Sequence, residues 1–85
     1  MKVEELSENI ETKKDFEVFL ENLRADFDTN KDEWENRNLK DFLEALHAYT
    51  SSIEGYYKNM DIPFDENRPT WQNFADVLLG ATVYE

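Results

Sequence analysis

The first residues to test for chemistry are Glu44 and His47, which stand three positions apart in a stretch with helical periodicity. A glutamate and a histidine at this spacing share one face of a helix and bind metal in carboxylate-bridged di-metal bundles. Such a centre needs a second pair and two further inward glutamates, whereas this chain has a single histidine. Both residues also fall on the flank or back of the apolar stripe. We therefore interpret them as part of a solvated helix face.

The acidic residues offer a second candidate, because Asp26, Asp28 and Asn30 alternate as the ligands of a calcium loop do. An EF-hand has glycine at its sixth position and glutamate at its twelfth. Those positions hold Lys31 and Arg37 here, so we discard a calcium site. The chain has no cysteine and only two glycines, which excludes thiolate chemistry and a glycine-rich phosphate loop. The sequence predicts no catalytic residue, no metal and no cofactor, and hence a protein that is not an enzyme.

Candidate binding residues gather at the end of the longest amphipathic stretch and in the polar segment after it. Adjacent tyrosines on a helix cannot point the same way, so we expect one of Tyr56 and Tyr57 to pack and the other to lie at the rim. A tyrosine rimmed by carboxylates suits contact with a basic partner, and the alternative is that both rings only close the end of the core. The predicted partner-binding set is Glu54, Tyr56, Tyr57, Asp61, Asp65 and Glu66.

The helix that carries these residues is predicted over Asn38–Met60, where apolar residues recur every three or four positions. Asn38 can cap its first turn. Gly55 near its far end bends the helix, stops it early or makes room for a ring. A flank of small residues would let a neighbouring helix approach closely, and it consists of Ala45, Ala48 and Ser52. We expect this helix to organise the fold.

The preceding helix is predicted to begin at a capping box, because Thr12 lies three positions before Asp15. It extends from about Lys13 to about Asp28. Ahead of it, Val3–Ile10 has apolar residues at helical spacing. We expect that segment to form either a short N-terminal helix or a docked arm.

The connection between these two helices contains Trp34 as its only large apolar residue. An isolated tryptophan is unfavourable in water, so we expect its ring to close one end of the core. The alternative is an exposed contact residue for a partner.

The last helix is predicted over Trp71–Tyr84, with Thr70 as its cap. Its apolar residues surround most of its circumference, so it is buried on several sides, or a homodimer forms through it. Gly80 provides a site of close backbone approach. We expect one domain over residues 1–85 with an all-α fold, a small bundle of three main helices plus a short N-terminal helix.

The chain carries a net charge of −11, from twenty acids and nine bases. Nucleic acid phosphates and anionic membranes repel such a chain, so a functional partner is expected to be a basic protein, unless the charge only confers solubility. No apolar run approaches the length of a membrane span, and the N-terminal residues lack the apolar core of a signal peptide. With the lack of cysteine, these features favour a cytoplasmic protein.

Several short runs together resemble a family of small acidic bacterial proteins of unknown function. They are Trp34-Glu35-Asn36, Phe42-Leu43-Glu44-Ala45, Glu54-Gly55-Tyr56-Tyr57, Trp71 with Phe74-Ala75, and the ending Tyr84-Glu85. The resemblance extends from about Thr12 to the last residue. It implies no activity, because the shared residues are aromatics, small residues and caps of the kind that maintain a fold.

A second likeness, in size, charge and expected architecture, is to the immunity proteins of nuclease bacteriocins, which bind their toxin through a surface tyrosine pair. The flanking residues of that motif are missing here, since Gly55 precedes the pair and Lys58 follows it. The likeness is an analogy in charge and architecture. The sequence therefore favours a non-enzymatic module that binds another protein through an acidic, aromatic-dotted face. The alternative is an immunity-like protein that masks a basic nuclease.

Overall fold

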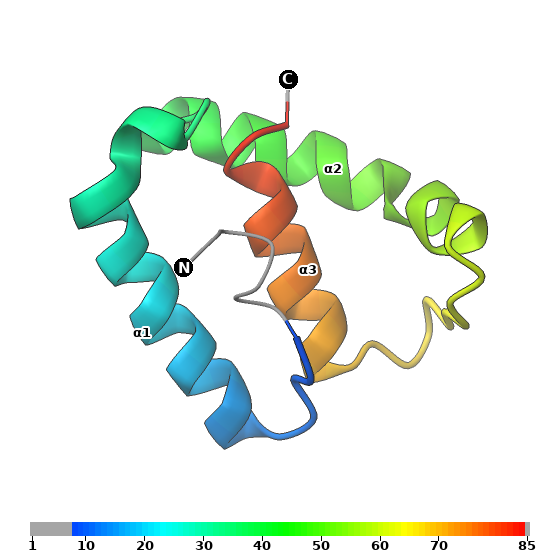
Figure 1. Ribbon diagram of the computed structural model, residues 1–85. Helices are drawn as coiled ribbons and strands as arrows, with labels where there is room; N and C mark the ends of the chain where they lie inside the picture. The colour runs from blue at the N-terminus through cyan, green and yellow to red at the C-terminus, as the bar shows by residue number, and fades with distance from the viewer. Residues whose placement is uncertain (1–7, 85) are drawn as a thin grey trace.

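The computed structural model describes residues 8–84, and this part of the chain is helical without any strand (Figure 1). Its elements are α1 (Lys13–Asn30), the 3-10 turn η2 (Lys31–Glu33), α2 (Leu39–Asn59) and α3 (Trp71–Ala81). The predicted all-α class and the three main helices are confirmed. None of the helices in the described part combines the length and apolarity needed to cross a membrane.

The three helices begin where their caps predict. The Thr12 hydroxyl accepts from the Asp15 N–H at 3.1 Å, and the Asp15 carboxylate accepts from the Thr12 N–H at 3.2 Å. Thr70 and Asn73 form the same reciprocal pair at the start of α3. At the start of α2, the Asn38 side chain accepts from the N–H of residue 41 at 2.8 Å. Local hydrogen bonds therefore determine these starts.

The first part of the predicted N-terminal helix over Val3–Ile10, up to residue 7, lies outside the described residues. Residues 8–11 are described, and they form a turn followed by chain without regular secondary structure instead of a helix. Ile10 is buried in the core, and its N–H donates to the Gln72 side chain at 2.8 Å. In its described part the segment is thus a docked arm, the second of the two forms expected.

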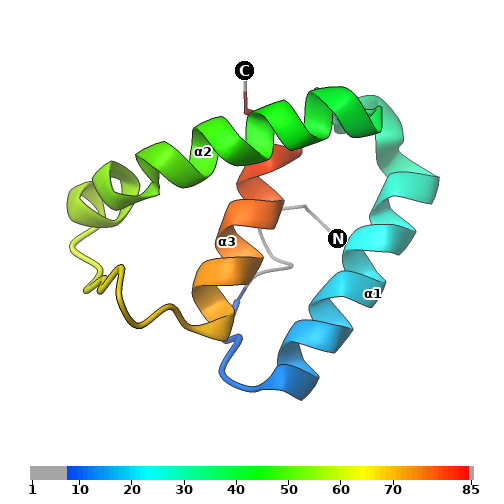
Figure 2. The ribbon, with the colours of Figure 1, turned by 180° about the vertical axis from the view of Figure 1, so that it is seen from behind.

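α3 is the helix on which the other two pack. From their connection at η2, α1 and α2 diverge, and α3 lies between them and contacts both (Figures 1 and 2). Ala75 and Ala81 of α3 have no exposed surface at all. The expectation that Asn38–Met60 organises the fold is therefore wrong, because the helix between the other two buries more of its circumference.

Trp34 closes one end of the core, as predicted. Only 7% of it is exposed, and its ring centroid lies 5.0 Å from that of Phe27 and 6.1 Å from that of Phe42. Its indole N–H donates to the buried carboxylate of Asp26 at 2.8 Å, and Asn30 donates to the other oxygen at 2.9 Å. The acid that began the discarded calcium pattern is thus the hydrogen-bond partner of the core tryptophan.

The close approach between α2 and α3 occurs at Gly80. A Cβ at this position would overlap the ring of Tyr49, so the predicted role of Gly80 is confirmed. The predicted small-residue flank of α2 contributes less, because only Ala45 of its three members is buried. Gly55 has nothing within 4 Å of an added Cβ, and α2 continues past it to Asn59. It therefore neither ends the helix nor makes room for a ring.

The C-terminal end of α3 is held by the segment after η2. The Asn36 side-chain amide donates to the carbonyls of Ala81 and Tyr84 at 2.9 and 2.8 Å. The backbone N–H groups of Glu35 and Asn36 donate to the Thr82 carbonyl at 2.9 and 3.1 Å. These bonds satisfy carbonyls at the helix end and just beyond it, and α3 stops at Ala81 instead of at Tyr84 as predicted.

Candidate functional site

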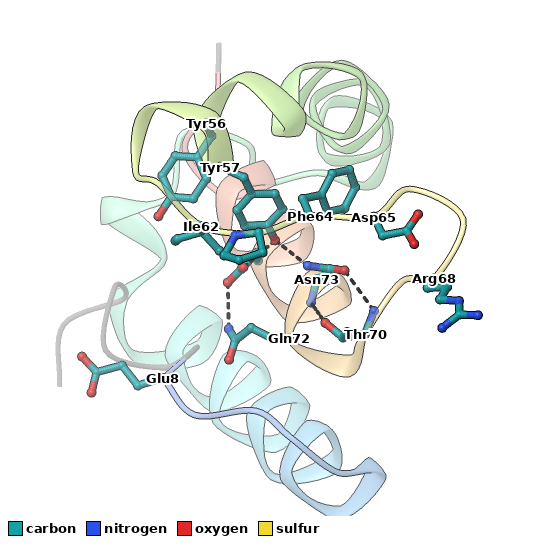
Figure 3. A pocket seen from close by; sticks show the side chains of 12 residues that line it. Glu8, Tyr56, Tyr57, Ile62, Phe64, Asp65, Arg68, Thr70, Gln72 and Asn73 are labelled. Atoms are coloured by element: carbon teal, nitrogen blue, oxygen red, sulfur yellow. Dashed lines mark hydrogen bonds between the residues drawn. The ribbon is translucent and has the colours of Figure 1, made fainter.

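A hollow beside the predicted binding residues lies between the end of α2, residues 60–70 and the start of α3 (Figure 3). We call it the loop hollow. It has a volume of about 700 Å³ and is open to solvent. Its lining residues are Glu8, Tyr56, Tyr57, Ile62, Pro63, Phe64, Asp65, Arg68, Thr70, Gln72, Asn73 and Asp76. Figure 3 shows the charged ends of Glu8 and Arg68 at opposite edges, each pointing away from the centre.

A hydrogen-bond network forms the floor of the loop hollow. The Tyr57 hydroxyl donates to Asp76 Oδ2 at 2.6 Å and accepts from Asn73 Nδ2 at 3.0 Å. Gln72 Nε2 donates to the other Asp76 oxygen at 2.9 Å, and Gln72 Oε1 accepts from the Ile10 N–H. The network joins the docked arm, α2 and α3 through side chains that satisfy one another. It therefore sets the shape of the hollow.

Burial and the hydrogen bond to Asp76 raise the pKa of Tyr57 well above its usual range. Both causes favour the neutral phenol, since burial disfavours the charged form and the bond to Asp76 needs the proton. At neutral pH the hydroxyl is consequently a hydrogen-bond donor held by Asp76. It is not available as a base.

The tyrosine pair divides its roles as the sequence predicts. Tyr57 is 2% exposed and Tyr56 is 43% exposed. The Tyr57 ring centroid lies 5.0 Å from that of Phe64. This ring contact packs the loop of residues 60–70 against α2. Because Tyr57 is buried, its predicted place among the partner-contacting residues needs correction: it supports the site from within, and Tyr56 is the tyrosine a partner can reach.

A second concave surface lies between the C-terminal half of α2 and the start of α3, and we call it the α2–α3 groove. It has a volume of about 390 Å³. Its lining residues are Thr50, Ser51, Ile53, Glu54, Tyr57, Phe64, Glu66, Pro69, Asn73, Phe74 and Val77. The groove and the loop hollow share the lining residues Tyr57, Phe64 and Asn73. The two surfaces are therefore adjacent, and these three side chains separate them.

The structure divides the predicted binding residues between these two surfaces. Tyr56 and Asp65 line the loop hollow, whereas Glu54 and Glu66 line the α2–α3 groove. All four are exposed. The predicted set thus borders two adjacent concavities instead of one patch.

Asp61, the remaining member of the set, lines neither surface and ends α2. Its φ of 56° places it in the left-handed region, where glycine is the usual residue. Its N–H donates to the Lys58 carbonyl at 3.2 Å, and the Ile62 N–H donates to the Tyr57 carbonyl at 2.9 Å. This pair of bonds is a Schellman motif, so the backbone role of Asp61 is to terminate the helix.

The site also contains residues that were not predicted from the sequence, namely Gln72, Asn73 and Asp76. Gln72 and Asp76 are four positions apart, so their shared helix face was predictable. Nothing local indicates that this face meets Tyr57, which stands 19 positions before Asp76. The earlier candidates Glu44 and His47 are exposed and line neither concave surface. Within residues 8–84, no cluster of three or more acids and histidines could hold a metal ion.

Comparison with known proteins yields one match. A family of unknown function, DUF7660, matches residues 12–85. No curated protein and no solved structure matches the chain. The matched range includes α1, α2 and α3 and the parts of both concave surfaces that these helices and the loop form. The docked arm precedes residue 12 and lies outside the match.

Proposed function

Since the chain belongs to the DUF7660 family of unknown function, we propose from its own geometry that it is a non-enzymatic module that binds another protein. The binding surface is the acidic face, defined as Glu54, Tyr56, Asp61, Asp65 and Glu66. The observation that supports this most directly is that all five side chains are exposed and that four of them, all but Asp61, line two adjacent concavities. Concave surfaces bordered by carboxylates and a reachable tyrosine suit protein recognition.

The charge of this face favours a basic partner. Its four carboxylates have Lys58 and Arg68 as their basic neighbours in sequence, and the whole chain has a net charge of −11. Complementary charge increases association rates and disfavours acidic partners. The absence of cysteine is compatible with a reducing, cytoplasmic setting for this interaction.

The polar floor of the loop hollow supports a binding role over an enzymatic one. Tyr57 and Asp76 are each other's hydrogen-bond partners, and the raised pKa of Tyr57 keeps its proton in place. His47 lines neither concavity. An immunity-like role would use both tyrosines of the pair, and the burial of Tyr57 leaves only Tyr56 accessible. The general interaction module is therefore the proposal.

The test is affinity capture from the native host with the full chain as bait. A face variant carries Tyr56→Ala, Glu54→Gln and Glu66→Gln, which removes exposed groups and leaves the Asp61 backbone motif intact. A charge-matched control carries Glu33→Gln and Glu44→Gln, whose side chains are also exposed but lie on other parts of the fold.

We expect a basic protein that is captured by the wild type and the control and lost with the face variant. Circular dichroism should show the same helical content for all three baits. Equal capture by the face variant, or a partner that is acidic, would contradict the proposal.

A further inference from the structure

We infer that the α2–α3 groove is the docking site for a short basic amphipathic α-helix of the partner. This inference rests on the proposed function and deepens it, because it names the form and chemistry of the bound segment. The contacts of the groove, its helical walls and its charges each support one part of the assignment.

The interior of the groove is apolar and partly open. Ile53 is buried at its base, while Phe64 and Val77 are half-buried. Phe74 is 42% exposed, and its ring centroid lies 5.9 Å from that of Trp71, which is 37% exposed. The apolar surface thus continues from the groove onto the first turn of α3. Such a surface favours a segment that brings apolar side chains of its own.

The walls of the groove determine the backbone form of the segment. The α2 turns over residues 50–57 and the α3 turns over residues 73–77 form its two long walls, and Phe64, Glu66 and Pro69 of the intervening loop complete the lining. Backbone N–H and C=O groups within helices are already paired, so the two helical walls offer no ladder to an extended strand. A segment that binds along these walls satisfies its own backbone groups when it is an α-helix. Recognition of an amphipathic helix in an apolar groove follows this logic.

The length of the groove matches about two helical turns. Residues 50–57 of α2 rise by roughly 10 Å along the helix axis. Anchors at positions i, i+3, i+4 and i+7 of a bound helix span a similar distance. The segment therefore needs three or four apolar residues on one face.

The charges that line the groove select a basic helix over an acidic one. Its ionisable lining residues other than Tyr57 are Glu54 and Glu66, and no lysine, arginine or histidine lines it. The loop hollow, by contrast, is lined by Arg68 as well as by the acids Glu8, Asp65 and Asp76. Lysines or arginines that flank the apolar anchors would thus meet carboxylates and no like charge at the groove.

The test uses a synthetic probe of about 16 residues, long enough to become helical on binding. It carries leucines at positions i, i+3, i+4 and i+7 and lysines on its other face. A scrambled peptide of the same composition and a version with glutamate in place of lysine are the peptide controls. Binding to the full chain is followed by ¹⁵N–¹H NMR and isothermal titration calorimetry.

Two groove variants, each with a matched control elsewhere on the surface, test whether the probe binds in the groove. Ser51→Trp places a bulky ring in the groove without changing charge. Thr29→Trp is its matched control, because Ser51 and Thr29 are both exposed helix residues whose hydroxyls donate to the carbonyl four positions earlier, each at 3.1 Å. Glu54→Lys reverses a groove charge, and Glu44→Lys makes the same change at an exposed position of α2 outside the groove.

We expect the probe to shift the amide signals of residues 50–57 and 73–77, with affinity lowered about tenfold or more by Ser51→Trp and Glu54→Lys. Both matched controls should retain wild-type affinity. Equal binding of the scrambled peptide, signals that shift only around Tyr56 and Arg68, or no binding would overturn the inference. Self-association that Ser51→Trp abolishes, seen by light scattering, would also overturn it and assign the groove to a second copy.

The same variants keep the two proposals distinguishable in the capture experiment. If the native partner is lost with Tyr56→Ala but is retained by Ser51→Trp, the groove inference fails and the proposed function stands. If the whole acidic face can be neutralised without loss of the partner, the proposed function fails as well.

Discussion

Tyr57 is the side chain that connects most of the site. Its hydroxyl joins Asp76 and Asn73 of α3, its ring packs on Phe64 of the following loop, and its backbone carbonyl accepts the bond that ends α2. A single buried phenol therefore aligns two helices and a loop. Its loss should affect stability before it affects any contact with a partner.

The buried phenol predicts a loss of stability at alkaline pH. Because burial and the bond to Asp76 raise the folded-state pKa of Tyr57 above the unfolded value of about 10, the folded protein holds this proton more strongly. Its stabilisation is complete below about pH 10 and is lost as pH rises through the folded pKa. Urea unfolding measured from about pH 8 to about pH 11 should show this decline, and Tyr57→Phe should make it smaller.

Tyr56→Phe is the control for this measurement, because it retains Tyr57 and should retain the decline. Burial also raises the pKa of Tyr49, so Tyr57→Phe is expected to reduce the decline without abolishing it. An identical pH dependence in wild type and Tyr57→Phe would contradict the assignment.

The two glycines predict opposite responses to the same substitution. Gly55→Ala adds a Cβ that meets nothing, so it should stabilise α2 by about 0.5–1 kcal/mol through helix propensity. Gly80→Ala adds a Cβ that overlaps the Tyr49 ring, so it should destabilise by about 1–3 kcal/mol. Urea unfolding of both variants measures the difference. Stabilisation by Gly80→Ala would show that α2 and α3 are not in close contact there.

At the scale of elements, the C-terminal end of α2 determines where the loop that lines the loop hollow leaves the helix. The Schellman motif at Asp61 turns the chain out of the helix, and Ile62 then lines the loop hollow. An aspartate at this position is unfavourable for stability for two reasons. A non-glycine residue is strained at a φ of 56°, and a carboxylate near a helix C-terminus opposes the helix dipole.

Asp61→Gly should therefore stabilise the protein by about 0.5–1 kcal/mol through relief of the backbone strain. Asp61→Asn separates the two causes, because asparagine removes the charge and keeps a side chain at the same backbone conformation. Thermal unfolding followed by circular dichroism measures both variants. A loss of stability in Asp61→Gly would mean that the Asp61 side chain makes a net favourable contact in the folded state.

At the scale of the molecule, the negative charge is largely unneutralised. Within residues 8–84, Lys13 and Glu17 form an ion pair at 2.7 Å, while the chain has twenty acids and nine bases. Excess charge of one sign opposes compaction through mutual repulsion. The same excess charge attracts a basic partner. Stability therefore favours a smaller net charge, whereas the proposed function favours a larger one.

Salt should raise the stability of this protein. Between about 0.01 M and about 1 M NaCl the screening length falls from about 30 Å to about 3 Å, which weakens the repulsion. The thermal midpoint should rise by several degrees across this range, and by less in Glu44→Lys, whose net charge is smaller. A midpoint that falls with salt would show that favourable ion pairs outweigh the repulsion.

The sequence by itself determined the features that depend on neighbours within one helical turn. Thr12, Asn38 and Thr70 mark the starts of the helices because each cap bonds to a backbone group a few positions on. The division of the tyrosine pair follows from helix geometry, and the burial of Trp34 follows from the unfavourable exposure of an isolated indole.

Only the tertiary structure decided the features that join distant segments. The carbonyl of Ala81, at the end of α3, accepts a hydrogen bond from Asn36, which lies 45 positions earlier. The floor of the loop hollow joins Tyr57 to Asp76, 19 positions later, and joins Gln72 to a backbone group 62 positions before it. Such contacts depend on how whole helices are placed, and periodicity specifies which face of a helix is apolar without specifying which neighbour covers it.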